Sequence, residues 1–132
     1  EYNFNSKNYE IKYVSPYSIN DEIINSNFGI FFPVKGFYLN AYFPTKLGEF
    51  LSNGIPIITC NINNHVNSII KENQIGIIID DLDNFNFEKF YQEMLKLLND
   101  INISERCINT AKKYFDIKKA NRVYSEIYKS LN

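Results

Sequence analysis

The sequence predicts an α/β fold in which a doubly wound parallel sheet carries helices on both faces. Three short segments predict buried strands: residues 29–34 (GIFFPV), 56–60 (PIITC) and 75–79 (IGIII). Each is almost entirely apolar, which is typical of parallel strands that helices cover on both sides. Helical patterns separate the three segments, and such alternation indicates an open α/β sheet rather than a sandwich or a bundle.

Length and composition favour one soluble domain over residues 1–132. The chain is 45% hydrophobic and 22% charged, a balance typical of globular proteins. Its net charge of -1 gives no basis for nucleic-acid binding, which favours a basic stripe. No apolar run reaches the roughly 20 residues of a membrane-spanning helix. Two distant cysteines, Cys60 and Cys107, indicate reduced thiols in a cytoplasmic protein.

The remaining elements follow from local signals. Residues 11–15 (IKYVS) predict a short strand that Pro16 ends, and residues 16–27 have isoleucines at helical spacing. Further helices are expected from Thr45 to Asn53 and within residues 62–73. After Asn84 the pattern is helical to the end, in residues 87–100, 104–115 and 116–131.

The helix expected at Thr45 begins unusually. Thr45 is a good N-cap after Pro44, which makes Lys46 the first helical residue. A cation there opposes the helix macrodipole, at a cost of roughly 0.3 to 1 kcal/mol. Free backbone N–H groups and an ammonium together favour an anion-binding site. The segment from Lys35 to Lys46 also follows a predicted strand, where ligands bind in doubly wound sheets.

A purely structural interpretation of this helix is equally open. Glu49 lies three residues after Lys46, so the two side chains could form a simple surface ion pair. Gly48 weakens the first turn by up to about 1 kcal/mol of helix propensity, and it leaves room for a ligand. Leu47 supplies part of the apolar stripe that faces the core, while Gly54 ends the helix.

Other polar residues have simpler explanations than a site. His65 is expected at the surface near a helix start, and no other potential ligand shares a metal-site spacing with it. An acidic run after the third strand is expected to be solvated or to cap a helix, so no metal site is predicted. The aromatic residues before Thr45 are expected either to line a pocket or to pack against another domain, and the sequence favours neither. The acidic run consists of Asp80, Asp81 and Asp83. The aromatic residues are Phe37, Tyr38, Tyr42 and Phe43.

The segment 43–58 (FPTKLGEFLSNGIPII) resembles the Pro-Thr-Lys-x-x-Glu-Tyr-Leu-Ala-x-Gly-x-Pro-Val-Ile segment of GT-B glycosyltransferases of family 4, also called group 1. The strand before it, the segment 72–80 after it and the closing helices resemble the same family in order. The resemblance covers most of the chain. It implies the C-terminal, Rossmann-like half of a GT-B fold, which binds a nucleotide-diphosphate sugar without a bound metal or other cofactor.

The resemblance also implies roles for individual residues. Glu49 corresponds to the glutamate that accepts hydrogen bonds from the ribose hydroxyls of the donor. The backbone at Phe43, Pro44 and Thr45 corresponds to the stretch whose N–H groups meet the diphosphate or the donor sugar. Lys46 lies beside that stretch. No catalytic residue is assigned in this chain.

The nucleobase loop of the family corresponds to Val14, Ser15 and Tyr17. One position departs from the family pattern, because many members carry a second glutamate near the donor sugar where this chain has Ala41. The members that share the Pro-Thr-Lys sequence often lack that glutamate as well.

For the whole protein, the resemblance implies hexosyl transfer to a glycan, lipid or polysaccharide precursor in the cytoplasm or at the inner face of the membrane. The chain begins at Glu1, so we expect an upstream acceptor-binding domain and the first strand, helix and strand of this domain. Without them the chain should catalyse no transfer. Two alternatives stay open: a non-catalytic nucleotide- or partner-binding α/β module, and a sugar-nucleotide epimerase of the same architecture.

Overall fold

The computed structural model describes residues 8–34 and 36–131. At its centre lies a three-stranded parallel sheet in the order β1–β2–β3, made of β1 (Gly29–Phe31), β2 (Ile57–Cys60) and β3 (Gly76–Ile79). Ile58 in β2 is in register with Ile30 on one side and Ile77 on the other. The predicted α/β fold with a parallel sheet is therefore confirmed.

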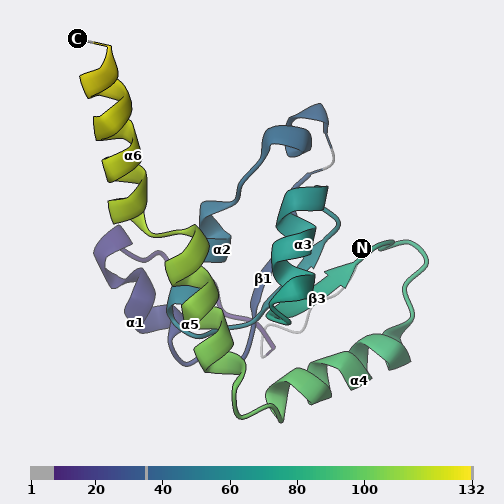
Figure 1. The fold of residues 1–132 in the computed structure, drawn as a ribbon. Coiled ribbons are helices and arrows are strands. Elements are labelled where there is room, and N and C mark those ends of the chain that lie inside the picture. The colour runs from purple at the N-terminus through teal and green to yellow at the C-terminus, as the bar shows by residue number, and fades with distance from the viewer. Residues whose placement is uncertain (1–7, 35, 132) are drawn as a thin grey trace.

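Helices connect and cover the strands (Figure 1). The packing described below places α2, α3 and α5 on one face of the sheet and α4 on the other. The C-terminal helix α6 extends away from the rest of the chain. The helical elements are η1 (Pro16–Ser18), α1 (Ile19–Ile23), η2 (Phe37–Ala41), α2 (Thr45–Ser52), α3 (Asn64–Glu72), α4 (Phe87–Leu98), α5 (Ile103–Tyr114) and α6 (Ile117–Ser130).

The larger core lies between the sheet and helices α2, α3 and α5. Ile57 of β2 is fully buried there, and the helices contribute side chains that are buried just as completely. Burial of one such side chain contributes roughly 1.5 to 3 kcal/mol. The fully buried helical members of this core are Leu47, Leu51, Val66, Ile70 and Cys107.

A smaller core covers the opposite face of the sheet. Ile58, Ile77 and Ile79 point away from the first core, because side chains alternate along a strand. Phe90 and Met94 of α4 pack against them. Both faces of β2 are thus covered, as its unbroken apolar sequence predicts.

Two strand predictions need correction. Residues 11–15 form no strand; Lys12 instead binds Glu22 of α1 at 2.8 Å, and Tyr13 is fully exposed. An isolated extended segment gains nothing from its β propensity without a neighbouring strand. The predicted strand 29–34 is also shorter than expected and only partly buried, with Ile30 58% exposed. In the described sheet β1 has a neighbour on one side only.

Cys107 gives a testable pH dependence. Both cysteines are free and buried, and burial raises the pKa of the Cys107 thiol from 9.0 to about 12. Above about pH 9 the unfolded thiol loses its proton while the folded thiol keeps it. The free energy of unfolding should therefore fall between these two pKa values, by at most about 1.4 kcal/mol per pH unit.

Urea denaturation at pH 8 and pH 10.5 measures this effect, with Cys107→Ala as the control that lacks the thiol. The stability of the wild type relative to this variant should decrease at the higher pH. Parallel pH profiles of the two proteins would contradict the burial of a protonated thiol.

Candidate functional site

Helix α2 begins one residue earlier than predicted. Pro44 is the N-cap, with φ −73° and ψ 120°, and its carbonyl accepts a hydrogen bond from the Leu47 N–H at 3.1 Å. Thr45 is therefore the first helical residue and not the cap, and Lys46 is the second. The extended backbone of Pro44 is compatible with the N-cap, although its side chain forms no capping hydrogen bond. The first-turn amides of Thr45 and Lys46 have no acceptor inside the helix.

Lys46 and Glu49 form the surface ion pair that their spacing suggested. The Lys46 Nζ lies 3.3 Å from the Glu49 Oε2, with side chains 57% and 39% exposed. Pairs this accessible contribute at most about 1 kcal/mol to stability. The pair leaves both charged groups within reach of a ligand from solvent, so it does not exclude an anion site.

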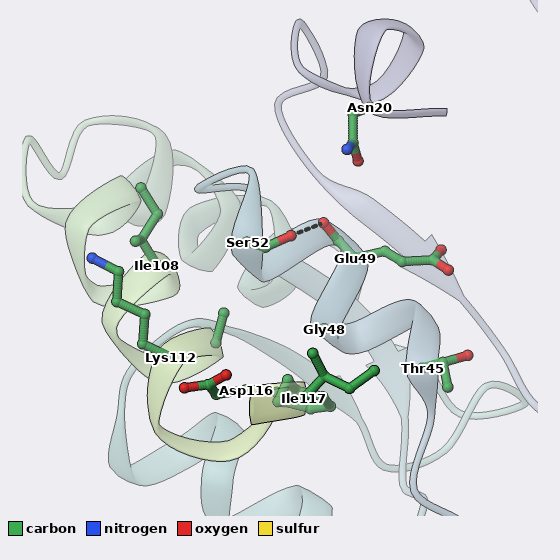
Figure 2. Close-up of a pocket in the computed structure, with 11 residues that line it drawn as sticks. Asn20, Thr45, Gly48, Glu49, Ser52, Ile108, Lys112, Asp116 and Ile117 are labelled. Atoms are coloured by element: carbon green, nitrogen blue, oxygen red, sulfur yellow. Dashed lines mark hydrogen bonds between the residues drawn. The ribbon is translucent and has the colours of Figure 1, made fainter. Parts of the chain in front are cut away.

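An open pocket of about 630 Å³ lies against α2 (Figure 2). Glu49 extends from the helix on the side where Thr45 and Asn20 lie. Asp116 and Ile117 lie on the other side of Gly48 from the Glu49 side chain. The lining combines apolar and polar residues. Its members are Asn20, Thr45, Gly48, Glu49, Ser52, Ile108, Ala111, Lys112, Phe115, Asp116 and Ile117.

Gly48 has a packing role in addition to the space that it leaves in the pocket. A Cβ atom at this position would lie 2.7 Å from Cδ1 of the Phe115 ring, closer than real Cβ contacts. The weak helix former in the first turn of α2 is thus explained by the approach of α5. The expectation that this glycine simply makes room for a ligand is therefore incomplete.

The aromatic segment before α2 is tied to the neighbouring helices. Phe43 stacks on Phe115 with ring centroids 4.8 Å apart and planes at 21°, and its ring lies 5.7 Å from that of His65. The Asn63 amide donates to the carbonyls of Leu39 and Tyr42 at 2.7 and 2.8 Å. These contacts fix the backbone that enters α2.

The predicted nucleobase loop does not contribute to the lining of this pocket. Ser15 caps η1 by accepting from the Tyr17 N–H at 3.4 Å, while the Tyr17 side chain is 96% exposed and Val14 is half-buried. The loop leads into α1, where the Asn20 side chain accepts a hydrogen bond at 3.2 Å from Asn53, the C-cap of α2. Asn53 also donates to the Glu49 carbonyl at 2.9 Å. One hydrogen-bond chain therefore links α1 to the helix that carries Glu49.

Several pocket residues were not predicted from the sequence. Asn20 and Ser52 lie in ordinary helical segments, and Lys112 and Ile117 lie far along the chain from the α2 motif. Asp116 had one local signal, since its carboxylate caps α6 by accepting from the Lys118 N–H at 2.9 Å. A cap signal does not reveal that the α5–α6 junction faces α2.

In residues 8–34 and 36–131, no three His, Cys, Asp or Glu side chains are arranged to hold a metal ion. Asp80, Asp81 and Asp83 are exposed, and the Asp81 carboxylate accepts from the Asp83 N–H at 2.9 Å. Across the same residues, each helix is too short or too polar to cross a bilayer.

Comparison with known protein families identifies the family of this chain. Residues 3–111 match the family model described as glucosyltransferase 3-like, C-terminal domain. The chain belongs to this family. Searches of curated proteins and of solved structures returned no match. Family membership confirms the expected C-terminal glycosyltransferase domain, and the Rossmann-like α/β architecture agrees with it.

Proposed function

We propose that this chain is the donor half of a glycosyltransferase and binds a nucleotide-diphosphate sugar at the start of α2. The observation that carries the proposal is the position of Glu49. Its partly exposed carboxylate lies on the pocket rim, one turn from the amides that open the helix. In a glycosyltransferase-type domain, a carboxylate in this position could bind the ribose of a donor while the helix amides bind the neighbouring diphosphate.

The chemistry follows from the groups that converge there. A carboxylate accepts charge-assisted hydrogen bonds from two neighbouring ribose hydroxyls. The first-turn amides of α2 and the Lys46 ammonium attract the diphosphate. Phe43, Pro44 and Thr45 form the backbone that leads into this first turn. As the sugar leaves, the same donors stabilise the charge that develops on the diphosphate. This mechanism uses no metal ion or other cofactor.

The nucleobase, the acceptor and the transferred sugar would lie around the diphosphate. Val14, Ser15 and Tyr17 would hold the nucleobase edge, since α1 connects their loop to α2. A separate domain would bind the acceptor, and catalysis would take place between that domain and this one. We further propose hexosyl transfer to a glycan, lipid or polysaccharide precursor, in the cytoplasm or at the inner face of the membrane.

Titration of UDP, GDP and ADP against the protein that contains this chain tests the proposal. At least one nucleotide should bind with a Kd in the range of micromolar to low millimolar. Absence of binding by all three at millimolar concentration would contradict the proposed donor site. Binding without turnover of any sugar nucleotide, in the presence of acceptor extracts, would favour the non-catalytic module.

The charge of Lys46 gives a second test. Lys46→Ala should weaken nucleoside diphosphate binding by roughly tenfold, because it removes one charge-assisted contact of about 1.5 kcal/mol. Stability should hardly change, since an accessible ion pair contributes little and the lysine opposes the helix dipole. Isothermal titration and thermal melting measure the two effects.

Lys89→Ala is the matched control. Lys89 also pairs with a glutamate one turn away, Glu93, at 4.0 Å, but on α4 across the sheet. Equal losses of affinity in the two variants would show that the effect of Lys46 is not local.

A further inference from the structure

We infer that Phe115 is a positioning residue for the donor site, acting through Phe43 and Gly48 on the start of α2. This inference rests on the proposed function and extends it to a residue outside the α2 motif. Phe115 ends α5, where its N–H donates to the Ala111 carbonyl at 2.8 Å. Phe115 is half-buried and lines the pocket.

The Phe115 ring contacts two parts of the chain around the start of α2. It stacks on Phe43, directly before the Pro44 cap of α2. It also fills the space that the missing side chain of Gly48 leaves, within one turn of the same cap. A single ring therefore contacts the chain both before and after the amides of Thr45 and Lys46.

The backbone around Phe115 is itself held in place. Lys119 of α6 donates to the carbonyls of Lys112 and Lys113 at 3.1 and 3.5 Å, which satisfies acceptors at the end of α5. Asp116, the next residue, caps α6. Because both helix ends at this junction are capped, Phe115 has little freedom to move away from Phe43. The rigid ring is expected to hold the first turn of α2 in the geometry that meets a diphosphate.

Phe115→Leu tests the inference because it keeps an apolar side chain but removes the stacking surface. In the protein that contains this chain, affinity for the tightest-binding of UDP, GDP and ADP should fall about tenfold, as expected when a site is no longer preorganised. Phe115→Tyr retains the ring and should restore affinity to within about twofold of the wild type.

Phe90→Leu is the matched control, since Phe90 is also half-buried but packs on the opposite face of the sheet. It should lower the melting temperature comparably while leaving the Kd unchanged. Hydrogen–deuterium exchange without nucleotide supplies an independent readout. Exchange of a peptide covering residues 43–52 should become severalfold faster in Phe115→Leu and not in Phe90→Leu.

The Gly48 contact gives a third measurement. Gly48→Ala should also weaken nucleotide binding, because its Cβ displaces the Phe115 ring. In the double variant Gly48→Ala/Phe115→Leu, the loss of affinity should be smaller than the product of the two single losses. Multiplicative losses would contradict action through the same contact.

The outcomes separate the two proposals. Equal Kd changes in Phe115→Leu and Phe90→Leu, or unchanged exchange of residues 43–52, would overturn the positioning role while leaving the donor site intact. A wild type that binds none of the three nucleotides would overturn the donor site, and with it the inference. Faster exchange with an unchanged Kd would show a structural contact only, and would also overturn the positioning role.

Discussion

Glu49→Ala is expected to weaken donor binding by roughly ten- to a hundredfold, the equivalent of a charge-assisted contact of about 1.5 to 3 kcal/mol. The carboxylate lies on the pocket rim, with its side chain 39% exposed, so it can bind ribose hydroxyls without first being uncovered. Glu49→Gln keeps an acceptor oxygen but loses the charge, and should show an intermediate loss. Titration with nucleoside diphosphate and donor kinetics measure both.

Glu93→Ala is the matched control for Glu49→Ala. Glu93 pairs with Lys89 on α4 and has a similar accessibility, at 46%. Neither glutamate variant should change the free energy of unfolding by more than about 1 kcal/mol. If Glu49→Ala lowers the melting temperature while donor kinetics stay intact, α2 is a structural helix and its ion pair has no part in binding.

Ile70→Ala is expected to have the largest effect on stability. Ile70 of α3 is completely buried in the larger core, between the sheet and the neighbouring helices. Truncation to alanine removes its transfer free energy and leaves a cavity, at a cost of about 2 to 5 kcal/mol. Loss of this size is a large part of the stability of an ordinary domain.

The same substitution at Ile101 provides the comparison. Ile101 lies between α4 and α5 and is 94% exposed, so Ile101→Ala should change stability by no more than about 0.5 kcal/mol. Chemical denaturation of both variants measures the difference. Similar losses at the two positions would mean that the core described around α3 is wrong.

Most of the fold was predictable from the sequence, because in most elements the apolar residues of the local pattern are the residues that are buried. β2 and β3 are apolar at successive positions, and both lie between helices. Gly54 ends α2 with φ +75°, a conformation that favours glycine. β1 has the same kind of sequence, yet Ile30 is exposed. A pattern of apolar residues does not record where a strand lies within the sheet.

The candidate site was predictable only in its α2 portion. Lys46 and Glu49 lie in one short motif, so their spacing alone predicts that they meet. The α5–α6 junction reaches the same pocket through tertiary packing, and Phe115 carries no local signal for that contact. The sequence also predicted the wrong N-cap. Thr45 has the better capping side chain, but in the structure Pro44 is the N-cap and its carbonyl accepts the first hydrogen bond of α2.

The short strand β1 bears on how residues 1–132 behave at high concentration when they are produced alone. In the described sheet one side of β1 is unpaired, and such an edge can recruit strands of other molecules into aggregates. β1 ends at Phe31, however, and Pro33 follows two residues later without an N–H to donate. An incoming strand could therefore extend its ladder over only a few residues. When residues 1–132 are produced alone, Pro33 is therefore expected to limit intermolecular β-pairing at a site where the exposed Ile30 and Phe32 would otherwise promote it.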